Sequence, residues 1–261
     1  MQTVLPTAAQ AEVARLASDY DLVAVPVVNE DRRLLGVVTV DDVIDAIEEE
    51  QTEDVQKLGG MEALDEPYMQ IGFLAMLKKR AGWLSILMVS EMFTTSALQH
   101  YDQELQRAAV LTLFVPLVMS SGGNSGSQST SLITRAMALD EVRLKDWWRV
   151  AVRELPSGAA LGAILGVIAI VRILLWQRLG FYDYTMKGQT GIWHVAGTIA
   201  CALVGIVTFG SLTGSMLPFL LRRLGFAPAS ASAPFVATLV DVTGLVIYFS
   251  VAALVLRGTL L

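Results

Sequence analysis

The stretch that decides the fold is Pro234–Leu256, PFVATLVDVTGLVIYFSVAALVL, an apolar run with a single carboxylate, Asp241, near its middle. A helix needs roughly 20 apolar residues to cross a bilayer, so this run predicts a membrane-spanning helix. An ionised carboxylate at membrane depth costs roughly 2.5–3.5 kcal/mol on insertion scales. Such a group faces a partner or a water-filled path. Asp241 therefore indicates an ion or proton site, and a charge buried against another helix for packing is the alternative.

Helical spacing groups the polar and small side chains of this run on one stripe. A hydroxyl, a carboxylate, a small residue and a phenol share that face, while Val, Leu, Ile and Phe cover the others. The stripe consists of Pro234, Thr238, Asp241, Gly244 or Leu245, and Tyr248.

The composition places the chain among membrane proteins. Of its 261 residues 54% are hydrophobic and 17% are charged, whereas soluble domains have about 45–50% apolar and about 25% charged residues. Acidic residues concentrate before residue 70, and apolar runs dominate from residue 81 onward. We expect a small polar N-terminal module followed by a polytopic α-helical membrane domain. The net charge of −6 and the absence of a basic patch give no sign of a nucleic-acid partner.

The polar module, residues 1–57, has the pattern of a compact α/β unit. Helical periodicity covers 8–20, buried strands are predicted over 22–28 and 34–40 with a polar turn between them, and a second helix begins near residue 43. That helix contains DDVIDAIEEEQTED, residues 41–54, with eight acids and no basic residue. Carboxylates three and four residues apart share a face and repel. The run is either a solvated surface or a site for hard divalent cations, which prefer oxygen ligands.

Five spanning segments are predicted after this module, over 81–99, 107–139, 149–176, 192–221 and 232–256. Gly59-Gly60 end the acidic helix, and residues 71–79 are expected to form a separate lead-in helix on the membrane surface. Lys and Arg are more frequent on the side that holds the N-terminal module, which makes that side cytoplasmic. We expect a multi-pass protein of the cell inner (plasma) membrane with a cytoplasmic N-terminus and an external C-terminus. The residues on the basic side are Lys78, Lys79, Arg80, Arg135, Arg143, Lys145, Arg149, Arg153, Arg222 and Arg223.

The second segment contains an unusual polar patch, PLVMSSGGNSGSQSTSL, residues 116–132. Small and polar residues at membrane depth lie against protein or water rather than lipid. Helix packing through small residues is one explanation, since Gly122, Gly123 and Gly126 permit close approach. A polar lining is the other, because Ser120, Asn124, Ser127 and Gln128 share a face. The sequence contains neither GxxxxGK[ST] nor GxGxxG, the two glycine-rich patterns that bind phosphate.

Three motifs together make the chain resemble the MgtE family of magnesium channels. The N-terminal sequence DLVAVPVVNEDRRLLGVVTVDDVIDAI is similar to one cystathionine-β-synthase-type (CBS) motif and continues into the acidic run up to Asp54. The second motif is Pro116-Leu117-Val118 followed by GGNSGSQ, residues 122–128, and the third is PFVATLVDVTGLVIYF, residues 234–249. The similarity covers nearly the whole chain in the expected order. Because such CBS motifs generally occur in pairs, we expect this chain to be the C-terminal part of a longer protein or a shortened form.

The resemblance implies a homodimer with a pore on its two-fold axis, lined by the second and fifth spanning helices. It implies three parts, a single CBS motif with the start of the acidic connecting helix over 1–57, a linker and connecting helix over 58–80, and a five-helix pore domain over 81–261. It places a hydrated Mg²⁺ at Asp241 from each copy, with Asn124, Gly123, Ser120 and Thr238 lining the pore. It also implies that cytoplasmic Mg²⁺ binds regulatory acids and closes the pore. These acids are Asp21, Asp42, Asp45, Glu50, Glu53 and Asp54.

The chain departs from the family pattern at two positions. Ala227 stands where the family commonly has an acid before Pro228-Ala229, and Asp102 stands where it often has a glutamate. Nothing in the sequence supports nucleotide binding at the single CBS motif. Two other functions fit an intramembrane aspartate, a proton-coupled divalent-cation carrier with Asp241 as the titrating group, and an intramembrane aspartyl protease. The protease is disfavoured because no GxGD motif is present, and we expect no enzyme.

Overall fold

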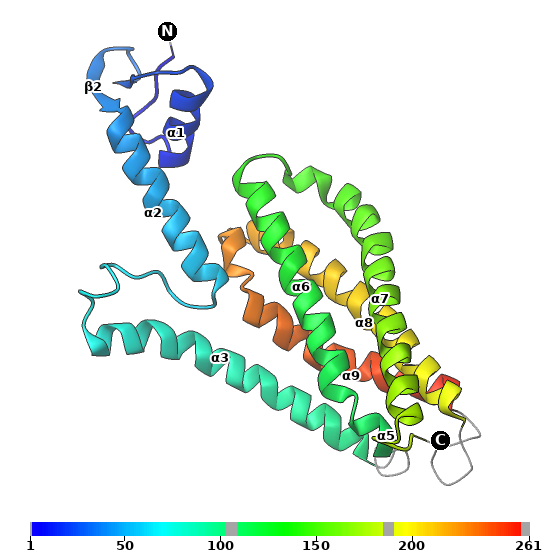
Figure 1. The fold of residues 1–261 in the computed structure, drawn as a ribbon. Helices are drawn as coiled ribbons and strands as arrows, with labels where there is room; N and C mark the ends of the chain where they lie inside the picture. Colours follow the sequence, from blue (N-terminus) through cyan, green and yellow to red (C-terminus); the bar gives the residue numbers. More distant parts are fainter. Residues whose placement is uncertain (1, 103–108, 185–190, 257–261) are drawn as a thin grey trace.

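The computed structural model describes residues 2–102, 109–184 and 191–256. Its two parts are a small module at the N-terminal end and a bundle of long helices (Figure 1). The module contains α1 (Gln10–Asp19), the antiparallel strands β1 (Ala24–Val28) and β2 (Leu34–Thr39), and the first turns of α2 (Val40–Leu58). The predicted order of helix, strand, turn, strand and helix is confirmed. The small apolar core of the module consists of Val4, Val13, Ala17, Val25 and Val43.

The acidic helix α2 begins three residues earlier than expected because its N-terminus is capped. The Thr39 hydroxyl donates to the Asp42 carboxylate at 2.7 Å, and the Thr39 N–H approaches the same oxygen at 3.3 Å. The second of these bonds satisfies the N–H of the residue that precedes the helix, as in a capping box. The helix ends at Leu58, before Gly60 with φ +75°, a conformation that favours glycine.

The long helices are α3 (Phe73–His100), α6 (Val115–Ala138), α7 (Trp147–Arg178), α8 (Ile192–Arg223) and α9 (Ala233–Val255), with the short helices α5 (Ala109–Thr112), η1 (Leu144–Asp146) and η2 (Pro228–Ser230) between them. In the described part of the chain, four helices are long and apolar enough to cross a membrane, namely α3, α7 with η1, α8 and α9. The fifth long helix, α6, contains the polar patch that lowers its hydropathy. Its 24 residues are about 36 Å long at 1.5 Å per residue, enough to span a bilayer. The fold class, an α-helical polytopic membrane protein with a small α/β module, is confirmed.

One expectation about α3 is wrong. Residues 71–79 do not form a separate lead-in helix, since α3 is continuous from Phe73 to His100. No proline and no left-handed glycine that would end a helix lies between Phe73 and His100. The predicted start of the second span at residue 107 lies outside the described residues.

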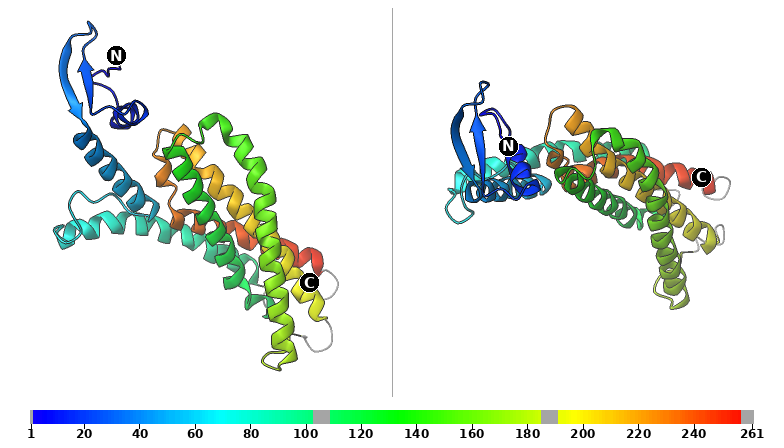
Figure 2. Two further views of the ribbon diagram at one scale, coloured as in Figure 1. Left: turned by 45° about the horizontal axis from the view of Figure 1, so that its top comes forward. Right: turned by 90° about the horizontal axis from the view of Figure 1, so that it is seen from above.

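Helix α8 is the centre of the bundle, because α6, α7 and α9 all pack against it. α3 has its main contact with α9 and otherwise runs apart from the bundle (Figures 1 and 2). Large apolar side chains on α3, such as Leu84, Met88 and Phe93, are accordingly exposed. Exposure of this kind is typical of a helix that faces lipid or another chain.

The closest helix contact joins α6 and α8 through pairs of glycines. A Cβ placed on Gly210 would lie 2.3 Å from the carbonyl oxygen of Gly122, and one on Gly214 would lie 2.1 Å from that of Gly126. Next to these glycines, the Ser125 and Ser211 hydroxyls are 2.6 Å apart. Small residues that let backbones touch, together with interhelical hydroxyl bonds, are the usual means by which membrane helices associate. The packing explanation therefore accounts for Gly122 and Gly126.

Gly214→Ala should destabilise the bundle by about 1–3 kcal/mol, the usual cost of overpacking, because its Cβ would meet backbone that cannot rotate away. Gly197→Ala on the same helix is the matched control, since nothing lies within 4 Å of a Cβ there and alanine favours a helix interior. Thermal unfolding of the detergent-solubilised protein measures both. Equal transition temperatures for the two variants would contradict this packing account.

Candidate functional site

The N-terminus of α9 is fixed by contacts from two other elements. The Ser232 hydroxyl accepts the N–H of Phe235 at 3.3 Å and caps the helix. The indole Nε1 of Trp83 on α3 donates to the same hydroxyl at 3.1 Å. Gly60, at the end of the acidic helix, lies against Trp83 and Pro234, since a Cβ there would be 2.9 Å and 3.2 Å from their side chains. α2, α3 and α9 therefore meet at one point.

Asp241 lies eight residues after the start of α9, two turns into the helix, and is partly buried. In the described residues it has no ion pair with Lys, Arg or His. Its neighbours Ala237 and Val240 contact Gly123 and Gly122 of α6. The glycine patch thus holds α6 directly beside the part of α9 that carries the carboxylate.

The polar face of α6 lies on its uncovered side. Ser120 and Asn124 are exposed, and the Asn124 Nδ2 donates to the Ser120 Oγ at 3.4 Å. Gln128 is exposed as well, whereas the Ser127 hydroxyl donates to the Ala233 carbonyl at 3.2 Å at the start of α9. The face formed by α6 and α9 therefore offers hydroxyl and amide groups near Asp241, and α6 turns its glycines the other way.

Other members of the predicted α9 stripe are buried inside the chain. The Thr238 hydroxyl donates to the Pro234 carbonyl at 3.0 Å. Tyr248 is fully buried, and its hydroxyl donates to the Leu111 carbonyl at 2.8 Å. Gly244 lies against Met119. Packing thus accounts for Tyr248 and Gly244, whereas Asp241 has no ion pair among the described residues.

A second intramembrane carboxylate belongs to this region. Glu91, near the middle of α3, is exposed and lies close enough to Asp241 for their charges to interact. In the sequence, the one indication that Glu91 has a functional role is its position inside an apolar run. Its proximity to Asp241 depends on the pairing of α3 with α9, which the sequence did not reveal.

The predicted regulatory acids are spread over the module and α2. Asp21 is exposed with φ +49°, Asp42 caps α2, and Asp45 and Glu50 are exposed on that helix. Glu53 pairs with Lys57 at 2.5 Å. Asp54 is half-buried, and this burial raises the pKa of its carboxyl above the ordinary value, with Lys57 acting in the opposite direction.

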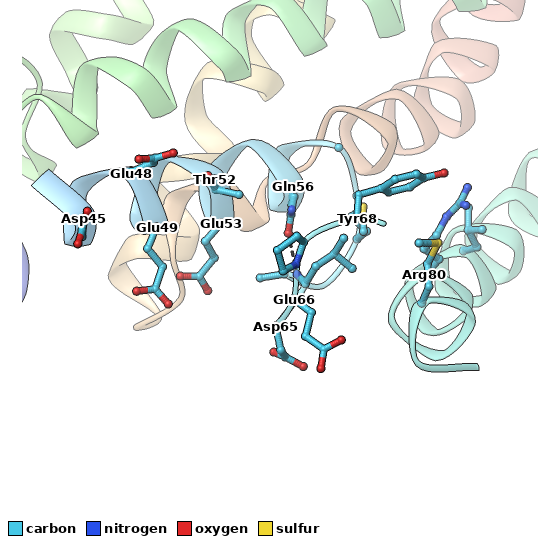
Figure 3. Close-up of a pocket in the computed structure, with 18 residues that line it drawn as sticks. Asp45, Glu48, Glu49, Thr52, Glu53, Gln56, Asp65, Glu66, Tyr68 and Arg80 are labelled. Carbon is cyan, nitrogen blue, oxygen red and sulfur yellow. Dashed lines mark hydrogen bonds between the residues drawn. The ribbon is translucent and has the colours of Figure 1, made fainter. Parts of the chain in front are cut away.

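A cavity of about 1180 Å³ lies between α2, the loop 59–68 and the beginning of α3, and it is strongly acidic (Figure 3). Arg80 is the one basic residue in its lining. Of the predicted acids, Asp45 and Glu53 line it, whereas Asp21, Asp42, Glu50 and Asp54 do not. Its carboxylates are those of Asp45, Glu48, Glu49, Glu53, Asp65 and Glu66.

In the described residues, no three of the His, Cys, Asp and Glu side chains converge on one point as metal ligands. The arrangement can attract hydrated cations to two places, the cavity beside α2 and the face that carries Asp241.

Comparison with known proteins matches both parts of the chain. The family profile MgtE, described as divalent cation transporter, matches residues 115–251, and the CBS domain profile matches residues 1–49. The magnesium transporter MgtE of Thermus thermophilus is 45% identical over 249 residues, 95% of this chain and 52% of that protein. The magnesium transporters MgtE of Enterococcus faecalis and Bacillus subtilis are 34% and 31% identical, over 95% and 93% of this chain and 51% of each relative. The chain spans about half the length of these relatives, and the resemblance inferred from its motifs is confirmed.

Asp54→Asn should stabilise the protein at neutral pH in the absence of Mg²⁺. Because folding raises the pKa of this carboxyl, the folded state binds the proton more tightly, and stability falls as pH rises from the ordinary pKa through the raised one. Because Asp54→Asn removes the titrating carboxyl, stability of the variant should decrease less as pH rises through this range. Thermal unfolding from about pH 4 to about pH 8 tests it, with Glu30→Gln, an exposed acid in the turn between β1 and β2, as control. A lower stability of the Asp54 variant at neutral pH would contradict the burial account.

Proposed function

The chain belongs to the MgtE family of divalent cation transporters, and from this membership we propose that it carries Mg²⁺ across a membrane, with the ion held at Asp241. The family consists of transporters rather than enzymes, as expected. The observation that supports Asp241 is its position, an acid two turns inside a spanning helix, without an ion pair in the described residues, beside the polar patch of α6. Mg²⁺ gives up its water reluctantly, so the carboxylate holds the ion through its water shell.

A homodimer is the assembly that we propose for the pore. Asn124 and Gln128 are exposed at membrane depth, where lipid cannot satisfy their amides. A second copy on this face would enclose water and bring a second Asp241 to the same path. Two carboxylates and the amide groups of α6 then surround a hydrated cation. The proposed lining comprises Ser120 and Asn124, which are exposed, and Asp241, which is partly exposed, whereas Gly123 and Thr238 are buried inside one copy.

We further propose that cytoplasmic Mg²⁺ regulates the pore through α2. Carboxylates on α2 and the loop 59–68 repel one another across the acidic cavity when cations are scarce, and Mg²⁺ between them would draw these elements together. Movement of α2 reaches α9 directly because Gly60 lies against Trp83 and Pro234. Support for this proposal comes from the contact between the end of the acidic helix and the beginning of the helix that carries Asp241.

The orientation that we propose is a cytoplasmic N-terminus in the cell inner (plasma) membrane. Arg15 of the module forms an ion pair with Asp140 in the connection between α6 and α7, so the module and this basic connection lie on the same side. The end of α9 lies at the opposite end of the bundle (Figure 1). An external C-terminus agrees with this arrangement, although residues 257–261 lie outside the described part.

Asp241→Asn should abolish Mg²⁺ flux, because the amide keeps the shape and removes the charge that retains the ion. Uptake of Mg²⁺ into liposomes containing the purified protein measures it, and growth of a transporter-deficient bacterium at low Mg²⁺ provides a second assay. Asp19→Asn in the exposed part of α1 is the matched control and should transport normally. Unchanged flux in the Asp241 variant would refute this assignment. Flux that follows an imposed pH gradient would instead identify a proton-coupled carrier.

Neutralising Glu50, Glu53 and Asp54 together, as Gln, Gln and Asn, should leave the pore open at high internal Mg²⁺. Loss of these charges removes carboxylates of α2 that attract the ion, of which that of Glu53 lines the acidic cavity. Flux at low and high internal Mg²⁺, compared with the unmodified protein, is the measurement. If high internal Mg²⁺ still closes the triple variant, this part of the acidic helix is merely a solvated surface.

A further inference from the structure

Glu91 stands at a position that the packing of the chain alone does not explain. It lies in the middle of the apolar segment of α3, is exposed, and has no ion pair with Lys, Arg or His in the described residues. An ionised carboxylate facing lipid at this depth would cost a few kcal/mol. The face of α3 that carries Glu91 must therefore meet water or another polar surface.

Two aromatic contacts fix how α3 lies along α9. Trp83 packs against Phe235 with ring centroids 6.2 Å apart, and Tyr101 stacks on Phe249 at 4.5 Å. Residue numbers increase in the same direction in both pairs, so the two helices are parallel. Glu91 follows Trp83 by eight residues and Asp241 follows Phe235 by six. The two carboxylates therefore lie at the same level between the aromatic contacts, and their charges interact.

Both carboxylates lie beside the contact line of α3 and α9 rather than in it. Trp83 and Tyr101 are 18 residues apart, which is five helical turns, so they mark one face of α3. Glu91 is turned about 80° from that face at 100° per residue, in agreement with its exposure. Asp241 is likewise turned about 80–120° from Phe235 and Phe249 on α9 and remains partly exposed.

Thr94 supplies an independent polar group one turn further along α3. Its side chain is 8% exposed, and its Oγ1 has no hydrogen-bond partner in the described residues. Ser85 and Ser96 on the same helix donate to the carbonyl four residues earlier, the common arrangement for a hydroxyl in a membrane helix. Thr94 lies on the face of α3 that Trp83 and Tyr101 define, about 20° from their direction. Thr94 therefore lies in the contact between α3 and α9, and the two carboxylates lie beside this contact.

We propose that Glu91 is a second carboxylate of the transport site, which together with Asp241 increases the preference of the path for divalent over monovalent cations. A divalent ion gains twice as much as a monovalent ion from each added negative charge. With Asp241, Glu91 gives each copy two negative charges at one level of the membrane. Thr94, one turn from Glu91, adds a buried hydroxyl without a hydrogen-bond partner among the described residues to the same region. The proposal rests on the proposed function, because it assumes that the ion passes Asp241.

The first test compares Glu91→Gln and Glu91→Asp in liposomes containing the full chain. Glu91→Gln should raise the Mg²⁺ concentration for half-maximal flux about three- to ten-fold, the effect of removing one partly screened charge, and should increase competition by Na⁺. In Glu91→Asp, which keeps the charge, the half-saturating Mg²⁺ concentration and the competition by Na⁺ should both lie within about two-fold of the values for the unmodified chain. Glu141→Gln, an exposed acid in the connection between α6 and α7, is the matched control. If half-saturation and Na⁺ competition are unchanged in Glu91→Gln, the proposal is overturned.

Asp241→Asn separates the two proposals. If Asp241→Asn abolishes flux while Glu91→Gln changes nothing, the assignment of Glu91 to the transport site is refuted and the proposed function is retained. If Asp241→Asn transports normally, the transport site itself is misplaced.

A second variant covers the case in which Glu91→Gln does not fold. Glu91→Cys, made in a chain with Cys201→Ser, should react with a negatively charged, water-soluble thiol reagent and thereby regain Mg²⁺ affinity, while a neutral reagent of similar size should not restore it. Mg²⁺ should slow the reaction. A thiol that the soluble reagent does not reach would show that this face meets lipid and would overturn the proposal.

Discussion

The rest of the structure depends on one constraint, the cost of keeping inside a membrane the Asp241 carboxylate, which has no ion pair among the described residues. Desolvation of a charged group is expensive unless water or a cation replaces the lost hydration. Water at this depth requires helices that present polar side chains on one face and pack against other helices with the opposite face. α6 has this division, with Ser120 and Asn124 on its uncovered face and Gly122 and Gly126 against α8. The two explanations for the polar patch, packing and lining, therefore apply to different faces of the same helix.

Close packing of α6 on α8 gives this arrangement its rigidity. Contacts between backbones at the paired glycines leave little freedom for α6 to slide, and the bond between Ser125 and Ser211 fixes the rotation of the two helices. α9 then packs against both, which sets the depth of Asp241. Helices α2 and α3 are less constrained. α3 contacts mainly α9, and α2 reaches the bundle at η2 and Gly60. A rigid bundle at the proposed ion path, with a loosely attached N-terminal part, would suit the regulation that we propose.

The sequence predicted the elements well where one strong pattern determined them. The apolar run around Asp241, the glycine patch and the capped acidic helix each have a local cause, and each appears as a helix. Features that depend on which helices meet could not be predicted in this way. Tyr248 shares a stripe with Asp241 by helical spacing, yet at the level of Tyr248 this stripe is buried, and the tyrosine hydroxyl donates to the Leu111 carbonyl. Glu91 becomes significant through the parallel pairing of α3 and α9. Asp65 and Glu66 join the acidic cavity because the loop 59–68 folds back beside α2, a path that no periodicity indicates.

The junction at Gly60 gives a route by which charge on α2 would influence the proposed ion path, which α2 does not enter. Gly60 has a left-handed conformation and leaves no room for a side chain between Trp83 and Pro234, so a shift of α2 must displace one of these groups. Trp83 donates to the Ser232 hydroxyl that caps α9, and the loss of such a cap typically costs about 1 kcal/mol. Carboxylates that repel across the cavity and cations that draw them together would therefore act on the cap of the helix that holds Asp241. A coupling of this size corresponds to about a five-fold change in an equilibrium, which is enough to bias two states without either of them being unstable.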